Sequence, residues 1–164
     1  MSWSLRAEGL GKSFTLHLQG GVTLPVLHGI DLVVGPGECV ALAGPSGAGK
    51  STLMRCLYGN YGAEAGRILI RHDGAEADLV TADARLMRAI RRDTLGYVSQ
   101  FLRVIPRVPA LEIVAEPMIA RGVARDAALV RAEALLTRLN LPARLHHLPP
   151  ATFSGGEQQR VNLA

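Results

Sequence analysis

Lysine, aromatic residues and cysteine are scarce in this sequence, and long apolar runs are absent. Lys12 and Lys50 are the only lysines among 18 basic residues, and aromatic residues make up 4% of the chain. Cys39 and Cys56 lie in apolar segments without the spacing of metal ligands, which excludes a zinc or disulfide scaffold and predicts buried, reduced thiols. No run of about 18 apolar residues occurs and an acidic residue stands as early as Glu8, so we expect neither a membrane span nor a signal peptide and predict a cytoplasmic protein.

Size and charge are those of one globular domain. The 164 residues are 48% hydrophobic and 20% charged, with a net charge of +4. The arginines are spread along the chain and aromatic residues are few, so we expect no nucleic-acid partner.

The pattern of apolar and turn residues predicts an α/β chain that starts with strands. Residues 1–18 and 26–34 are predicted strands, separated by a turn at 19–21. Residues 38–43 form a short apolar run typical of a strand buried on both faces, and the segment from Lys50 has a helical pattern. Further along, the sequence predicts strands at 67–71, 78–80 and 94–99, helices at 82–92 and from an N-cap at Asp126, and a hairpin turn at Asp73 and Gly74.

The strongest motif is a glycine-rich loop, in which residues 44–51 carry the pattern G-x-x-x-x-G-K-[ST] between a predicted strand and a predicted helix. Glycines allow backbone turns that a Cβ would block, so successive N–H groups can converge on phosphate oxygens, and the amino end of the following helix favours the same anion. In such a loop Lys50 contacts the β- and γ-phosphates, where it serves catalysis, and the Ser51 hydroxyl binds Mg²⁺. The predicted nucleotide-phosphate site comprises Gly44, Pro45, Ser46, Gly47, Ala48, Gly49, Lys50 and Ser51, with Thr52 beside the phosphates.

A second motif lies near the end of the sequence, at residues 153–161. Ser154 and Glu157 alone form a capping box that starts a helix. Together with the phosphate loop, however, this segment resembles the signature motif S-G-G-[QE]-x-Q-R of ATP-binding cassette (ABC) ATPases. The resemblance implies an α/β P-loop NTPase of the ABC nucleotide-binding-domain type, with an N-terminal β-subdomain, a helical subdomain and the C-terminal part of the core missing. It also implies that residues 1–164 form one partial ATP-binding domain, in which about 94–160 include the Q-loop and the helical subdomain.

The resemblance assigns ATP and Mg²⁺ as cofactors and gives roles to further residues. Gln100, at the end of a predicted strand, matches the glutamine of the Q-loop, which approaches Mg²⁺ and the attacking water. Phe14 matches the aromatic residue that stacks on adenine, and a plain core residue is the alternative interpretation. The family forms head-to-tail dimers, here with itself or with a related ABC subunit, so Ser154, Gly155 and Gly156 are expected to contact ATP in trans.

Within this family the sequence resembles one branch in particular, the ATP-binding subunit L of the phosphonate carbon–phosphorus lyase system. The similarity extends over residues 20–27, 57–61, 98–108, 135–140 and 151–154. It implies a role in phosphonate metabolism beside other lyase-system subunits, supporting the formation of α-D-ribose 1-methylphosphonate 5-triphosphate from ATP and methylphosphonate. The alternative is the ATP-binding subunit of an ABC membrane transporter, in which the residues after Gln100 dock a membrane permease.

The elements that an ABC ATPase needs for hydrolysis do not occur where the family has them. In the family an apolar run ending in Asp, the Glu that follows it and a later His all come after the signature motif, where this sequence has residues 160–164. His146 and His147 precede the motif beside two prolines and are interpreted as loop residues. The sequence therefore predicts ATP binding with little or no hydrolysis, and a truncated, non-catalytic fragment of an ABC ATPase is a third interpretation.

Overall fold

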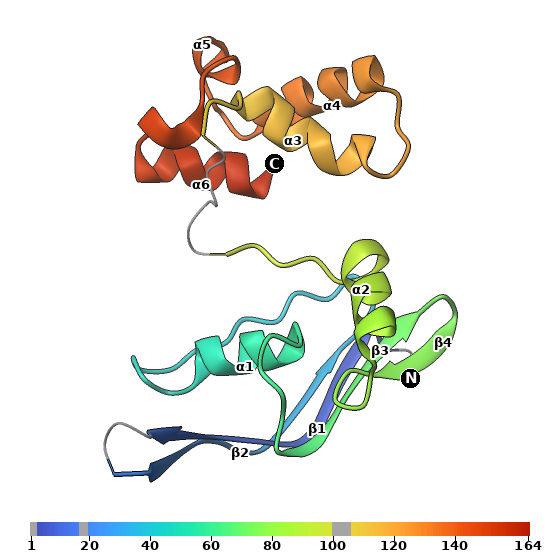
Figure 1. Ribbon diagram of the computed structural model, residues 1–164, viewed down its shortest axis with the longest axis vertical. Helices are drawn as coiled ribbons and strands as arrows, with labels where there is room; N and C mark the ends of the chain where they lie inside the picture. The colour runs from blue at the N-terminus through green and yellow to red at the C-terminus, as the bar shows by residue number, and fades with distance from the viewer. Residues whose placement is uncertain (1–2, 17–19, 100–105) are drawn as a thin grey trace. The chain divides into compact units, whose positions relative to one another are not determined.

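The structure of the chain is a computed structural model that describes residues 3–16, 20–99 and 106–164. It divides into two units, Met1–Tyr97 and Val98–Ala164, each with a hydrophobic core of its own. None of the helices in the described ranges is long and apolar enough to cross a membrane. Unit 1 contains β1 (Leu5–Leu16), β2 (Val22–Val34), α1 (Lys50–Leu57), β3 (Ala65–His72), β4 (Ala75–Asp78) and α2 (Ala84–Asp93) (Figure 1). Unit 2 contains α3 (Ala110–Ile119), α4 (Arg125–Arg138), α5 (Ala143–His146), the 3-10 helix η2 (Pro150–Thr152) and α6 (Gly155–Leu163).

Unit 1 is built on an antiparallel sheet with the strand order β2-β1-β3-β4. Residues Asp73 and Gly74 join β3 to β4, and their φ angles of 48° and 78° suit a two-residue hairpin turn. The predicted hairpin turn is therefore confirmed. The first two predicted strands are also present, although the second begins earlier than expected, at Val22.

Helices α1 and α2 cover one face of this sheet (Figure 1). Along β3 the side chains alternate between the two faces, which places Ile68 and Ile70 together against the helices. This packing fixes α1, and with it the start of the helix at Lys50, against the sheet. The shared core contains the buried residues Ala7, Leu10, Leu27, Leu53, Cys56, Leu57, Ile68, Ile70, Leu79 and Ile90.

The segments 38–43 and 94–99, predicted as strands, are not strands in the structure. The described sheet contains only β1 to β4, so neither segment has a partner in it. The predicted burial of 38–43 is also wrong, since Val40 is 40% exposed and Cys39 is exposed as well. Burial of the second thiol, Cys56, is confirmed. The apolar pattern identified segments suited to a buried sheet, but strand formation depends on neighbours that the described residues do not supply.

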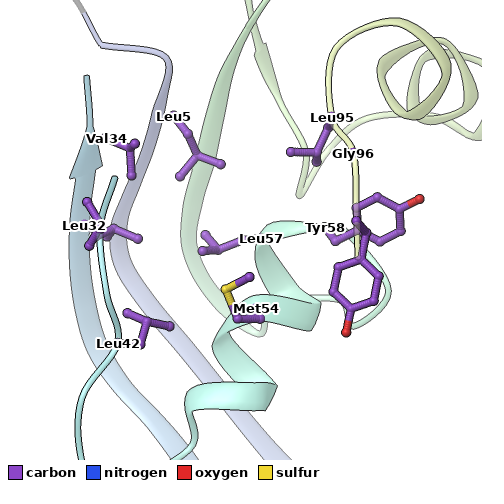
Figure 2. Close-up of a pocket in the computed structure, with 11 residues that line it drawn as sticks. Leu5, Leu32, Val34, Leu42, Met54, Leu57, Tyr58, Leu95 and Gly96 are labelled. Carbon is purple, nitrogen blue, oxygen red and sulfur yellow. The ribbon is translucent and has the colours of Figure 1, made fainter. Parts of the chain in front are cut away.

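Residues from both of these segments line an apolar pocket of about 310 Å³ on unit 1. Figure 2 shows side chains from β1, β2 and α1 around it, with Leu95 and Gly96 completing the wall. The rings of Tyr58 and Tyr97 lie at its rim with their centroids 4.9 Å apart. Because the lining is almost wholly apolar, the pocket does not suit a charged phosphate chain.

Unit 2 is helical, and α3, α4 and α6 enclose its core. The helix predicted from an N-cap at Asp126 is α4, but its N-cap is Ala124, so Asp126 stands in the first helical turn. His146 ends α5 and is buried, with Nε2 3.0 Å from the Leu141 oxygen, so its interpretation as a loop residue is wrong. The buried residues of this core are Ala110, Val114, Ala115, Ala128, Ala132, Leu136, Leu141, Phe153 and Val161.

Candidate nucleotide-binding site

The glycine-rich loop at residues 44–51 needs its glycines for two reasons. Gly44, Gly47 and Gly49 have φ angles of 146°, 84° and 85°, which residues with a Cβ rarely adopt. Gly49 is also crowded, because a Cβ there would lie 3.1 Å from the backbone oxygen of Val26 and 3.2 Å from its Cγ1. The conformation of the loop and the packing of its last glycine on β2 therefore both depend on the absence of a side chain.

The loop ends at the amino end of α1, which lacks a capping side chain. Gly49 is the N-cap residue, and within the described residues no side chain caps the helix and no acidic residue stands in its first turn. The amides of Lys50, Ser51 and Thr52 precede the first intrahelical bond, in which the Leu53 N–H donates to the Gly49 oxygen at 2.8 Å. These amides and the helix dipole together favour an anion such as a phosphate at this end of α1.

The Lys50 side chain folds back over the loop. Its Nζ donates to the backbone oxygens of Gly44 at 2.9 Å and of Pro45 at 2.7 Å. The ammonium group is thus held among the loop residues, close to the amino end of the helix that favours an anion. A phosphate oxygen carries a negative charge and is a stronger acceptor than these neutral carbonyl oxygens, so it can replace them as the partner of Lys50.

Ser51 fits a role as a Mg²⁺ ligand. It is exposed in the first turn of α1, and its hydroxyl oxygen is the hard donor that Mg²⁺ prefers. Nucleotide-bound Mg²⁺ takes one or two protein ligands and completes its shell with phosphate oxygens and water. Accordingly, it does not need a cluster of three or more His, Cys, Asp or Glu side chains, and the described residues contain none. Gln100, the other predicted Mg²⁺ ligand, lies outside the described residues.

Phe14, predicted to stack on adenine, lies on β1 among aromatic and charged side chains. It is half-buried, and its ring meets the Tyr61 ring edge to face, with centroids 5.3 Å apart and an interplanar angle of 76°. Lys12 Nζ lies 5.4 Å from the centroid of the Phe14 ring. Its neighbours thus hold the Phe14 ring in place, but the ring is not fully buried in the core. Stacking on a base requires this partial exposure.

The signature-like segment forms the start of α6. Ser154 is the N-cap residue, and its Oγ accepts a hydrogen bond from the Glu157 N–H at 3.4 Å. In return Glu157 Oε2 accepts from the Ser154 N–H at 2.8 Å and from the Ser154 hydroxyl at 2.7 Å, and these bonds lower the pKa of Glu157. The predicted capping box is confirmed. Gly155 and Gly156, in the first turn, are exposed, so this helix end is open to a ligand.

Asn162 was not singled out by the sequence, yet it contacts the residue before Gln100. Its Nδ2 donates to the backbone oxygen of Ser99 at 2.7 Å, and Gln159 Nε2 donates to the same oxygen at 3.4 Å. Residues 159 and 162 are three apart and share a face of α6, which the sequence could have indicated. The sequence could not indicate that this face contacts Ser99, because Ser99 is distant from α6 in the sequence.

The profile of a family described as ABC transporter matches residues 27–164, which include both motifs. The lipoprotein-releasing system ATP-binding protein LolD of Novosphingobium aromaticivorans is 44% identical over 160 residues, 98% of this chain and 68% of that protein. LolD 1 of Rhodospirillum rubrum is 42% identical over 98% of this chain and 67% of its own length, and LolD of Maricaulis maris is 46% identical over 86% and 59%. The chain thus spans about two thirds or less of the length of these curated relatives.

Two solved structures of the ATP-binding cassette MJ0796 are also similar. One is a dimeric post-hydrolysis state bound to ADP and Pi, with a TM-score of 0.84 and 29% identity, covering 97% of this chain and 67% of that chain. The other, a dimeric structure of the same bacterial ABC transporter cassette, has a TM-score of 0.83 over 96% and 66% of the two chains. The fold class predicted from the sequence is confirmed.

The interpretation as a subunit of the phosphonate carbon–phosphorus lyase system is wrong. Four similar curated proteins, 41–46% identical, are ATP-binding proteins of lipoprotein-releasing systems. They support the transporter alternative instead, and no phosphonate substrate or lyase-system partner is retained. A phosphate loop and a signature motif bind nucleotide whatever process the ATPase drives, so they do not identify that process. Residues 98–108, one of the segments that carry the similarity to that subunit, fall partly outside the described residues.

Proposed function

Because the chain belongs to the ABC transporter family, we propose that it is the ATP-binding part of a membrane transporter of the lipoprotein-releasing kind. The proposal is supported by four relatives, 41–46% identical, that are ATP-binding proteins of such systems. Residues 1–164 are then one partial ATP-binding domain, with the helical subdomain in about 94–160. The chain works at the cytoplasmic face of a membrane, and residues after Gln100 dock the permease.

The relatives carry the transport role, and the geometry of the phosphate loop carries the ATP-binding part of the proposal. The uncapped amides of α1 bind the phosphate chain of ATP, and Lys50 turns from the loop carbonyls to the β- and γ-phosphates. Ser51 holds Mg²⁺, which when bound neutralises part of the phosphate charge. Phe14 stacks on the adenine base, and Gln100 is the second Mg²⁺ ligand.

A second protomer completes the site. Ser154, Gly155 and Gly156 offer the amino end of α6 to the γ-phosphate of ATP bound by the partner, as the phosphate loop does from the other side. The similar MJ0796 cassettes are dimeric, which supports this arrangement. The dimer is head-to-tail, with a second copy or with a related ABC subunit.

A chimera tests the transport role. Residues 27–164 of this chain replace the matching residues of LolD from Novosphingobium aromaticivorans, which supplies the part of the protein that this chain does not span. In cells depleted of their own LolD, the chimera is expected to restore lipoprotein release, and the same chimera with Lys50→Ala is expected to fail. A chimera that folds and binds ATP but leaves lipoproteins unreleased would contradict the role.

A further inference from the structure

Tyr61 lies between α1 and Phe14 and contacts both. Its hydroxyl oxygen accepts a hydrogen bond from Arg55 Nη1 at 2.6 Å, and the Arg55 guanidinium lies 5.4 Å from its ring centroid. The Tyr61 N–H also donates to the Arg55 backbone oxygen at 3.2 Å. On its other side the Tyr61 ring meets Phe14 edge to face. Three contacts with one arginine therefore fix the tyrosine that packs on Phe14.

Glu64 binds the same loop to β1, the strand that carries Phe14. Its carboxylate accepts from Lys12 Nζ at 3.1 Å and from the Ser13 N–H at 2.9 Å, and these bonds lower the pKa of Glu64. Its own N–H donates to the Gly11 oxygen at 2.9 Å. The loop that contains Tyr61 and Glu64 is therefore bound to α1 at one end and to β1 at the other.

The same helix thus serves both parts of the nucleotide site. Lys50 and the uncapped amides stand at the amino end of α1, and Arg55 follows about one and a half turns later. A short helix packed on a sheet is rigid, so Arg55 holds Tyr61 at a fixed distance from the phosphate loop. Tyr61 therefore links the orientation of the Phe14 ring to α1, the helix whose amino end is proposed to bind the phosphates.

We propose that Tyr61, held by Arg55, is a positioning residue for Phe14 and so contributes to recognition of the purine base. The inference rests on the proposed ATP-binding function and deepens it by assigning base recognition to Arg55, Tyr61 and Phe14. An edge-to-face partner restricts rotation of the Phe14 ring and presents it in one orientation for stacking. The phosphate chain makes no use of this restriction, so the two parts of the ligand depend on different residues.

The test compares the affinity of the whole chain for ATP·Mg and for inorganic tripolyphosphate·Mg by titration calorimetry. Phe14→Ala is expected to weaken ATP about tenfold and to leave tripolyphosphate unchanged. Tyr61→Ala is expected to weaken ATP about threefold to tenfold, again without an effect on tripolyphosphate. In the double variant, Tyr61→Ala is expected to add nothing to the loss caused by Phe14→Ala, because it acts through that ring.

Two further variants keep the test decisive if Tyr61→Ala does not fold. Tyr61→Phe retains the ring and loses the bond to Arg55, and Arg55→Gln loses the guanidinium that lies on the ring; both are expected to weaken ATP selectively. The control is Arg71→Gln, which removes a guanidinium lying 4.8 Å from the Trp3 ring elsewhere on unit 1, and it is expected to change neither affinity.

The possible failures are distinguishable. Equal weakening of ATP and tripolyphosphate by the Tyr61 variants, no weakening of either, or additive losses in the double variant would overturn the positioning role alone. A wild-type chain that binds neither ligand, or a Lys50→Ala chain that binds both as well as the wild type, would overturn the proposed function itself.

Discussion

The side-chain amide of Asn162 donates a hydrogen bond of 2.7 Å to the backbone oxygen of Ser99. Asn162 stands in the last turn of α6, the helix that begins at the signature-like segment, and Ser99 immediately precedes Gln100. The helix proposed to meet ATP in trans is therefore attached to the backbone beside the predicted Q-loop glutamine.

Loss of this bond is expected to destabilise the protein measurably. Asn162→Ala should lower the free energy of unfolding in urea by about 1 kcal/mol, since the Ser99 oxygen loses its shorter hydrogen bond. Gln159→Ala is the matched control, because its bond to the same oxygen is longer, at 3.4 Å. A larger loss from the Gln159 variant than from the Asn162 variant would contradict this ranking.

Alanine substitutions at Gly47 and Gly49 of the phosphate loop are expected to lower the free energy of unfolding by different amounts. Gly47→Ala meets no neighbouring atom and costs only the positive φ, about 1–2 kcal/mol in the free energy of unfolding. Gly49→Ala has the same φ problem and also places a Cβ 3.1 Å from the Val26 oxygen, so its cost should be larger. Urea unfolding of both variants without nucleotide checks the difference, and equal costs would show that the contact with β2 is unimportant.

Local sequence patterns predicted the parts of the fold that depend on local chemistry. The hairpin at Asp73 and Gly74, the start of α1 and the capping box at Ser154 each follow from a few adjacent residues, and each is present. The segment 38–43 was predicted as a buried strand, but it is not a strand and most of its residues are exposed, because a strand needs neighbours that adjacent residues cannot specify. In the candidate site, the phosphate loop could be predicted for the same reason, because its motif consists of adjacent residues. The role of Tyr61 was not, since its contacts with Phe14 become visible only when β1 and the loop after α1 are folded together.

The capping box at α6 is expected to make stability depend on pH. Hydrogen bonds from Ser154 hold the pKa of Glu157 below its ordinary value of 4.5. A carboxyl group with a lowered pKa in the folded state stabilises that state fully above its unfolded pKa, and the contribution is lost as the pH falls through the lowered value. Urea unfolding of wild type and Glu157→Gln from pH 7 to pH 3 should show an advantage of the wild type that shrinks below about 4.5. An advantage that is constant across this range would contradict the assignment.

The hydroxyl side of the same box can be tested at neutral pH. Ser154→Ala should lower the free energy of unfolding by about 1 kcal/mol, because the Glu157 N–H loses its acceptor and the carboxylate loses a donor. Ser154→Asp is the matched control, since it restores an acceptor at the N-cap but places a second carboxylate beside Glu157. Ser154→Asp should therefore regain part of the stability that Ser154→Ala loses and should remain less stable than the wild type.

The central claim is that this chain binds ATP·Mg through its phosphate loop, and nucleotide-dependent stabilisation tests it most directly. With ATP·Mg at one hundred times the dissociation constant, the free energy of unfolding of the wild-type chain should rise by about 2.7 kcal/mol, and Lys50→Ala should abolish the rise. No stabilisation of the wild type at millimolar ATP·Mg, or equal stabilisation of Lys50→Ala, would contradict the claim.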